Sequence, residues 1–180
     1  MIRKLVHADA EVLRTKASKV RLDAVPCLCN NHMLALDLLE TMFFHRALGL
    51  AAPQIGIADA LFVINPLTEG LVTGLPEGQR PFVFVNPVLV RTEGDLVESV
   101  EGCLSLPDQL AFVSRAEHCL LQYDDLEGHQ HEAEFRGLVA RVVQHELDHL
   151  EGKLIQPPYF TRAELLQECG KRYGQGRSKS

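Results

Sequence analysis

Two histidines with a glutamate directly after the first are the residues of this sequence best suited to chemistry. They are His145 and His149, in the stretch QHELDHLEG. In an α-helix, residues four apart share a face, so both imidazoles can bind one metal ion. Glu146 lies about 100° around the helix from His145, off the line of the histidines but within reach of a water on the metal. This HExxH pattern therefore predicts two metal ligands and a general base.

Two histidines do not complete a catalytic metal site, and the sequence offers two kinds of third ligand. One class of metallopeptidase adds a third histidine, but Ile155 occupies that position, which excludes the class. Another class uses a glutamate on a following helix, for which Glu164 and Glu168 are candidates. The other choice is the thiolate of Cys103, which follows Gly102 at the end of a strand-like stretch. The residues alone leave both choices open.

The apolar patterns indicate the elements that must position these residues. The stretch 32–46 has apolar residues four apart, which predicts a helix. A helical period returns at 137–152, so the two histidines lie on a helix that ends at Gly152. Between these helices, β-branched and aromatic runs predict strands at 60–65, 82–92 and 118–135, the last of them a hairpin. Strands grouped between helices predict an α+β domain.

The composition is that of an ordinary globular protein and excludes several other classes. With 180 residues, 46% of them hydrophobic, the chain is expected to form one domain over 1–180, with 171–180 as a flexible tail. The net charge of −6 argues against a protein that coats nucleic acid. No apolar run approaches the roughly 20 residues that span a bilayer, and no signal peptide is visible, so we expect a cytoplasmic protein. Five scattered cysteines indicate free thiols.

Three segments resemble the signature motifs of the peptide deformylases, in the order and approximate spacing of that family. They are LGLAAPQ at 48–54, EGCLS at 101–105 and QHELDH at 144–149. The resemblance covers most of the chain, and three motifs in order are far more specific than one. Ala47 departs from the pattern, because the first motif usually has a glycine there. The added methyl group affects how closely a peptide can approach.

The resemblance implies a complete set of site residues and a fold. It implies one divalent ion, Fe²⁺ in the cell with Zn²⁺, Ni²⁺ or Co²⁺ as substitutes, held by Cys103, His145 and His149. It assigns Glu146 to acid–base chemistry, and it assigns Gln54 and the backbone N–H of Leu104 to stabilising the oxyanion. The expected fold has antiparallel or mixed sheets packed around a central helix that bears HExxH, with N-terminal and C-terminal helices.

The substrate implied by the resemblance is the N-terminal formyl-methionine of newly made polypeptides, which loses its formyl group as formate. Leu138 and Val142 precede His145 by seven and three residues, near the face of the histidines. With Leu48 they could bound a slot for the methionine side chain; alternatively, both only fill the core. The peptide backbone could add as a strand beside Gly49.

Partners other than the formyl peptide are expected to be few. We expect a monomer without a membrane or a specific nucleic acid as partner, although the basic tail at 170–180 could contact the ribosome transiently by charge. Two other functions compete with deformylation. One is an HExxH metallopeptidase with Glu168 as third ligand, and the other is a deformylase-like binding protein without turnover, in which Ala47 and the loop 108–112 block substrate.

Overall fold

The structure is a computed structural model that describes residues 1–22, 25–65, 72–73 and 83–173. Within these ranges the α-helices are α1 (Val25–Phe44), α2 (Gly137–Leu150) and α3 (Arg162–Tyr173). The strands are β1 (Gly49–Ala51), β2 (Leu61–Ile64), β3 (Val72–Thr73), β4 (Val83–Cys103), β5 (Leu106–Asp124) and β6 (Gln130–Arg136). Two short 3₁₀ helices are η1 (Glu11–Arg14) and η2 (Ala52–Ile55). Strands grouped between helices confirm the predicted α+β class.

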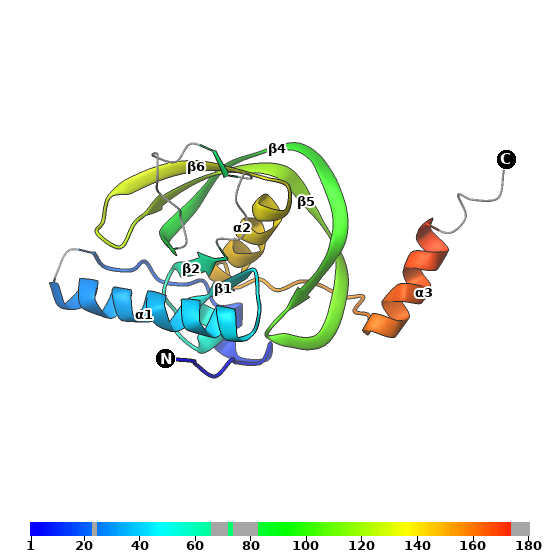
Figure 1. Cartoon of the computed structure of the whole chain (residues 1–180), viewed down its shortest axis with the longest axis horizontal. Coiled ribbons are helices and arrows are strands. Elements are labelled where there is room, and N and C mark those ends of the chain that lie inside the picture. The colour runs from blue at the N-terminus through cyan, green and yellow to red at the C-terminus, as the bar shows by residue number, and fades with distance from the viewer. Residues whose placement is uncertain (23–24, 66–71, 74–82, 174–180) are drawn as a thin grey trace.

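The described strands form one sheet in the order β1-β2-β4-β5-β6-β3, with every pairing antiparallel. The β4 and β5 strands are 21 and 19 residues long, and their pairing shifts register in several places, for example between Glu93 and Leu96. Such irregularities bend a sheet. Figure 1 shows β4 and β5 curving around α2, which lies inside the bend. This confirms the expected sheet around a central helix that carries HExxH.

The core packs aromatic rings of the sheet against one face of α2. Phe62 and Phe84 stack with ring centroids 4.7 Å apart, and Phe135 meets Phe84 edge-on at 5.7 Å. Val139 and Val143 of α2 are buried in the same cluster. Burying each such side chain stabilises the fold by about 1.5–3 kcal/mol. The sheet therefore holds α2 along its length, and the two histidines come from a rigid element.

The end of α2 is fixed by the glycine that the sequence predicted. Gly152 has a φ of 70°, in the left-handed region. Its N–H donates to the carbonyl of His149 at 3.2 Å, and the N–H of Lys153 donates to the carbonyl of Asp148 at 2.7 Å. These two bonds form a Schellman motif. The last turn of α2, which carries His149, is thereby prevented from fraying.

The predicted helix at 32–46 is present as α1 but begins earlier, at Val25. Its stripe of Leu34, Leu38 and Met42 is buried in a second cluster with Leu50 and Val63 of β1 and β2. Figure 1 shows α1 alongside these two strands. The helix therefore supports the short strand that faces α2.

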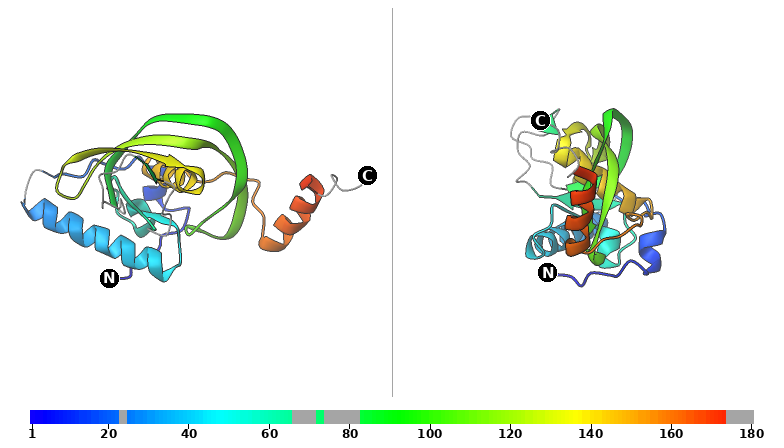
Figure 2. Two further views of the ribbon diagram at one scale, coloured as in Figure 1. Left: turned by 45° about the horizontal axis from the view of Figure 1, so that its top comes forward. Right: turned by 90° about the vertical axis from the view of Figure 1, so that its right-hand side faces the viewer.

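The last helix, α3, projects from the body of the molecule (Figures 1 and 2). Its start has a capping box, in which the Thr161 hydroxyl accepts from the N–H of Glu164 and the Glu164 carboxylate accepts from Thr161. Residues 171–173, which were expected to belong to a flexible tail, are helical here, and 174–180 lie outside the described residues. None of the described helices is long and apolar enough to cross a membrane.

Candidate active site

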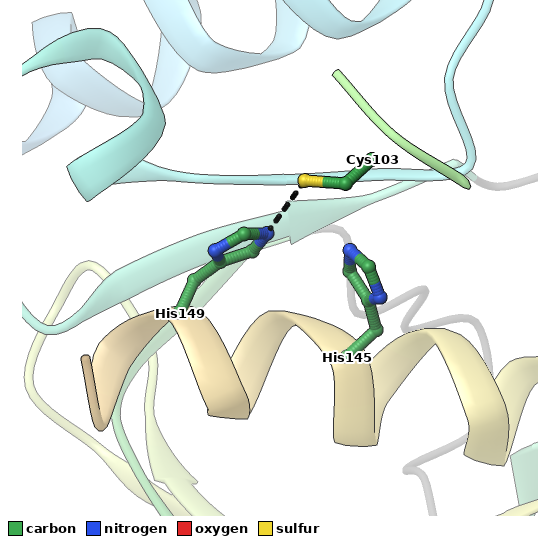
Figure 3. A group of neighbouring side chains, drawn as sticks. All are labelled: Cys103, His145 and His149. Atoms are coloured by element: carbon green, nitrogen blue, oxygen red, sulfur yellow. Dashed lines mark hydrogen bonds between the residues drawn. The ribbon is translucent and has the colours of Figure 1, made fainter. Parts of the chain in front are cut away.

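Three metal-ligand side chains from two distant segments meet at one point. Cys103 lies at the end of β4, and His145 and His149 lie on adjacent turns of α2 (Figure 3). Their ligand atoms all lie within 4.8 Å of one another, and Cys103 Sγ is 3.4 Å from His149 Nε2. Two ligands that bind one ion at about 2.0–2.3 Å in a tetrahedral arrangement lie about 3.5 Å apart. A thiolate and two imidazoles at this spacing fit a divalent transition metal.

The carboxylate of Glu101 fixes the ring of His145. Glu101 Oε2 lies 2.9 Å from His145 Nδ1, so the other ring nitrogen, Nε2, is left to face Cys103 and His149. Arg115 donates to both oxygens of Glu101, at 2.7 and 2.9 Å, and Arg141 donates to Oε1 at 2.7 Å. Although burial raises the pKa of Glu101, the hydrogen bonds from His145 and Arg115 lower it to about 2. The carboxylate is therefore ionised at neutral pH.

Glu101 is a further site residue, and the sequence carries a signal for it. Side chains two apart on a strand point to the same face, so a strand that ends at Cys103 places Glu101 beside it. Only 7% of Glu101 is exposed, and a buried acid requires cationic partners. Those partners come from β5 and α2. The pairing of Arg115 with Asp148 is also present, at 2.8 Å.

His149 is almost completely buried next to Cys103. Burial and the charges of His145 and Arg115 lower the pKa of His149 well below its usual value. Its Nδ1 has no hydrogen-bond partner among the residues that the structure describes. The ring is therefore neutral, which is the form that binds metal.

Glu146 and Gln54 line the same cavity as Cys103 and His145. Glu146 is only 3% exposed, burial raises its pKa to about 7, and its Oε2 lacks a partner within the described part of the chain. The Gln54 Nε2 donates to Cys103 Sγ at 3.6 Å, while its Oε1 accepts from the Ala51 N–H at 2.8 Å. This second bond orients the amide so that its NH₂ group points to the cysteine. Leu104 follows Cys103 in the turn between β4 and β5.

A cavity of about 710 Å³ opens above these residues. Its lining includes Cys103, His145 and every residue predicted to act on the reaction or the substrate: Gln54, Leu104, Glu146, Leu48, Gly49, Leu138 and Val142. Leu48 and Leu138 are 42% and 51% exposed, whereas Val142 is buried and also joins the core. The β1 strand is at the edge of the sheet, with one side paired to β2. No other described strand pairs with β1, so its second edge could accept an added strand.

The structure places the glutamates considered as third ligands away from Cys103, His145 and His149. Ile155 is buried in a cluster with Cys103, but its side chain has no atom that could bind a metal. Glu164 caps α3, and Glu168 pairs with Lys171 and Arg172 on the same helix, which Figure 1 shows far from α2. The predicted loop at 108–112 is wrong, because these residues belong to β5. Ala47 lines the cavity without closing it.

Comparison with known proteins identifies the family. A family model described as polypeptide deformylase matches residues 2–159. A peptide deformylase of Thermus thermophilus is 46% identical over 132 residues, which cover 67% of this chain and 66% of that protein. The chain thus spans just under two thirds of the length of this relative. A peptide deformylase of Dictyoglomus thermophilum is 37% identical over 156 residues, which cover 86% of this chain and 91% of that protein.

Solved structures give the same result. A crystal structure of a peptide deformylase from Synechococcus elongatus in complex with actinonin has a TM-score of 0.73 at 36% identity, covering 94% of this chain and 85% of that one. A peptide deformylase from Thermotoga maritima has a TM-score of 0.73 at 30% identity, covering 87% and 99%. The chain belongs to the polypeptide deformylase family, whose members are metal-dependent hydrolases that remove the N-formyl group from nascent polypeptides.

Proposed function

We propose that this chain removes the formyl group from formyl-methionyl N-termini, using a divalent ion held by Cys103, His145 and His149. One observation carries the proposal: the Cys103 thiol lies 3.4 Å from His149 Nε2, beside a buried Glu146 carboxylate, one oxygen of which has no hydrogen-bond partner among the described residues. Three protein donors leave one coordination position open, as in catalytic metal sites. We propose Fe²⁺ in the cell, with Zn²⁺, Ni²⁺ or Co²⁺ as substitutes, since this donor set suits all of them.

The bound ion would act as a Lewis acid that makes water a strong nucleophile near neutral pH. Glu146 is the group we assign to proton transfer. It lines the same cavity as Cys103 and His145, and one of its oxygens is not engaged elsewhere in the described structure. It accepts the proton of the attacking water and returns it to the amine that leaves, so one carboxylate serves both transfers.

Gln54 and Leu104 are the groups we assign to the formyl oxygen, where negative charge develops. The Ala51 N–H holds Gln54 Oε1, so the Nε2 group is directed into the site before substrate binds. The backbone N–H of Leu104 follows the Cys103 ligand directly in the turn after β4. Donors that are oriented in advance stabilise the transition state without reorganisation.

The methionine side chain would bind against Leu48, Leu138 and Val142, which line the cavity. Both leucines are about half exposed, and an apolar ligand that covers them is favoured by roughly 25 cal/mol per Å² buried. The peptide backbone would pair along the free edge of β1 at Gly49. In this arrangement the formyl carbonyl, at the start of the peptide, must reach Cys103 at the end of β4. The site would therefore recognise an N-terminal residue.

The compartment and partners follow from this substrate. Nascent chains are made in the cytoplasm, so we propose that the protein acts there. We also propose that it acts as a monomer. We also propose transient contact between ribosomal RNA and the basic C-terminal residues, through their charge.

The test compares metal content with formate release from formyl-Met-Ala-Ser. Glu146→Gln should keep its metal but lose about 10²–10⁴-fold in turnover, because it cannot accept the proton. Cys103→Ala should lose both metal and turnover, whereas the matched variant Cys169→Ala on α3 should keep both. A Cys103→Ala protein with stoichiometric metal, or a Glu146→Gln protein within about tenfold of the parent, would contradict the proposal.

A further inference from the structure

The backbone of β1 lies directly on the side chain of Glu146. A Cβ atom built on Gly49 would be 2.5 Å from Glu146 Oε1 and 2.9 Å from both Cδ and Cγ. Real Cβ atoms essentially never lie within 3.0 Å of another heavy atom. The φ of Gly49 lies outside the left-handed region. Glycine is therefore required at this position by the close approach and not by the backbone conformation.

The strand at this position is fixed more firmly than the carboxylate beneath it. Gly49 pairs with Ile64 in the sheet, and the carbonyl of Leu48 accepts from the N–H of Asn65 at 2.8 Å. The atoms nearest to the added Cβ are instead the far end of a flexible side chain, the Glu146 carboxylate. A methyl group at residue 49 would therefore displace the carboxylate and leave the strand in place.

We propose that Gly49 is a positioning residue for Glu146: the bare backbone at this point of β1 sets where the buried carboxylate lies over the site. This inference rests on the proposed role of Glu146 in deformylation. It differs from a role of Gly49 in binding peptide backbone, because it acts through a side chain of the enzyme. A misplacement of about 1 Å can reduce a rate about 10²-fold.

A double-mutant cycle tests the inference, with Gly49→Ala and Glu146→Asp made singly and together. Aspartate keeps a carboxylate but is one methylene shorter, so it removes the contact at 2.5 Å, the closest of the three, and relieves most of the clash with the methyl group. Gly49→Ala alone should lower kcat about 10²-fold with normal metal content and little change in KM. In the Glu146→Asp background, the same substitution should lower kcat less than about threefold, because coupled residues are not additive. Gly170→Ala, where an added Cβ meets nothing within 4 Å, is the matched control.

Specific outcomes of this cycle would contradict the role of Gly49 or the proposed function. An equal loss from Gly49→Ala in both backgrounds would overturn the inference, because residue 49 would then act on the substrate alone. A melting temperature lowered by more than about 10 °C would also overturn it, since the strand would then be the part that yields. Parental activity of Glu146→Asp and Glu146→Gln would instead remove Glu146 from the reaction and refute the proposed function itself.

Discussion

Replacement of Glu101 by glutamine should weaken both the fold and the metal site, because this carboxylate joins β4, β5 and α2. Its two oxygens accept four hydrogen bonds, two from Arg115, one from Arg141 and one from His145. Glutamine has the same size but offers one oxygen and one NH₂ group. The NH₂ group must then face an N–H donor. The buried Arg115 and the partly buried Arg141 lose the negative charge that they share.

The expected loss follows from these contacts. Removal of one partner of a buried ion pair costs about 3–5 kcal/mol. Arg115 keeps its bond to Asp148, and Arg141 keeps the carbonyls of Val97 and Val113. We therefore expect the lower end, a decrease of about 3 kcal/mol in the free energy of unfolding. Loss of the carboxylate that orients a histidine ligand typically lowers metal affinity about 10–100-fold.

Urea unfolding of the metal-free protein measures the first effect, and competition with a chelator measures the second. Glu98→Gln is the matched control, because Glu98 lies on the same strand but is exposed and pairs only at the surface with Arg172. It should change stability by less than about 1 kcal/mol. Suppose that Glu101→Gln also stays within about 1 kcal/mol of the parent and binds metal as tightly. Glu101 would then neither stabilise the fold nor orient His145, which contradicts the prediction.

Three other perturbations have defined outcomes. Gly152→Ala should lower the melting temperature by about 3–10 °C, because the added Cβ would lie 2.8 Å from backbone and φ is 70°; equal melting of this variant and Gly170→Ala would contradict that. Cys119 should resist iodoacetamide at pH 8 until the protein unfolds, because burial raises its pKa to about 12; peptide mapping checks this, and early labelling refutes it. Truncation after Gly170 removes Arg172, whose guanidinium lies 4.0 Å from the Phe112 ring centroid; the melting temperature should fall while kcat/KM for a short formyl peptide stays within about twofold.

The parts that the sequence predicted are those set by local pattern. The helix that carries HExxH could be identified because its apolar period and its terminal Gly152 are both local signals. The histidine spacing follows from the same helix geometry, and so does the prediction that Glu146 acts as an acid or base. Cys103 could be joined to them only through the motif EGCLS, because no local rule connects a residue of β4 with one of α2.

The parts that the sequence did not predict depend on tertiary contacts. The β4 strand continues past residue 92 to Cys103, but its residues at 89–99 are exposed, so they show no apolar alternation. The predicted helix at 32–46 does not extend back to Val25, because Pro26 is also typical of a chain break; proline is nevertheless tolerated in the first turn of a helix. Glu101 was missed because its arginine partners are distant in sequence.

The charged side chains around His145 form a network that suits a metal site. Glu101 and Asp148 carry two negative charges, and Arg115 and Arg141 carry two positive charges, so the four groups balance. The ring of His145 is thus oriented by a carboxylate without a surplus of positive charge that would repel a divalent cation. A single arginine or a single acid could not give both properties, because either one would leave a buried charge without compensation. With metal bound as proposed, the negative charge near the ligand atoms would then come from the Cys103 ligand and from Glu146, the group proposed to transfer protons.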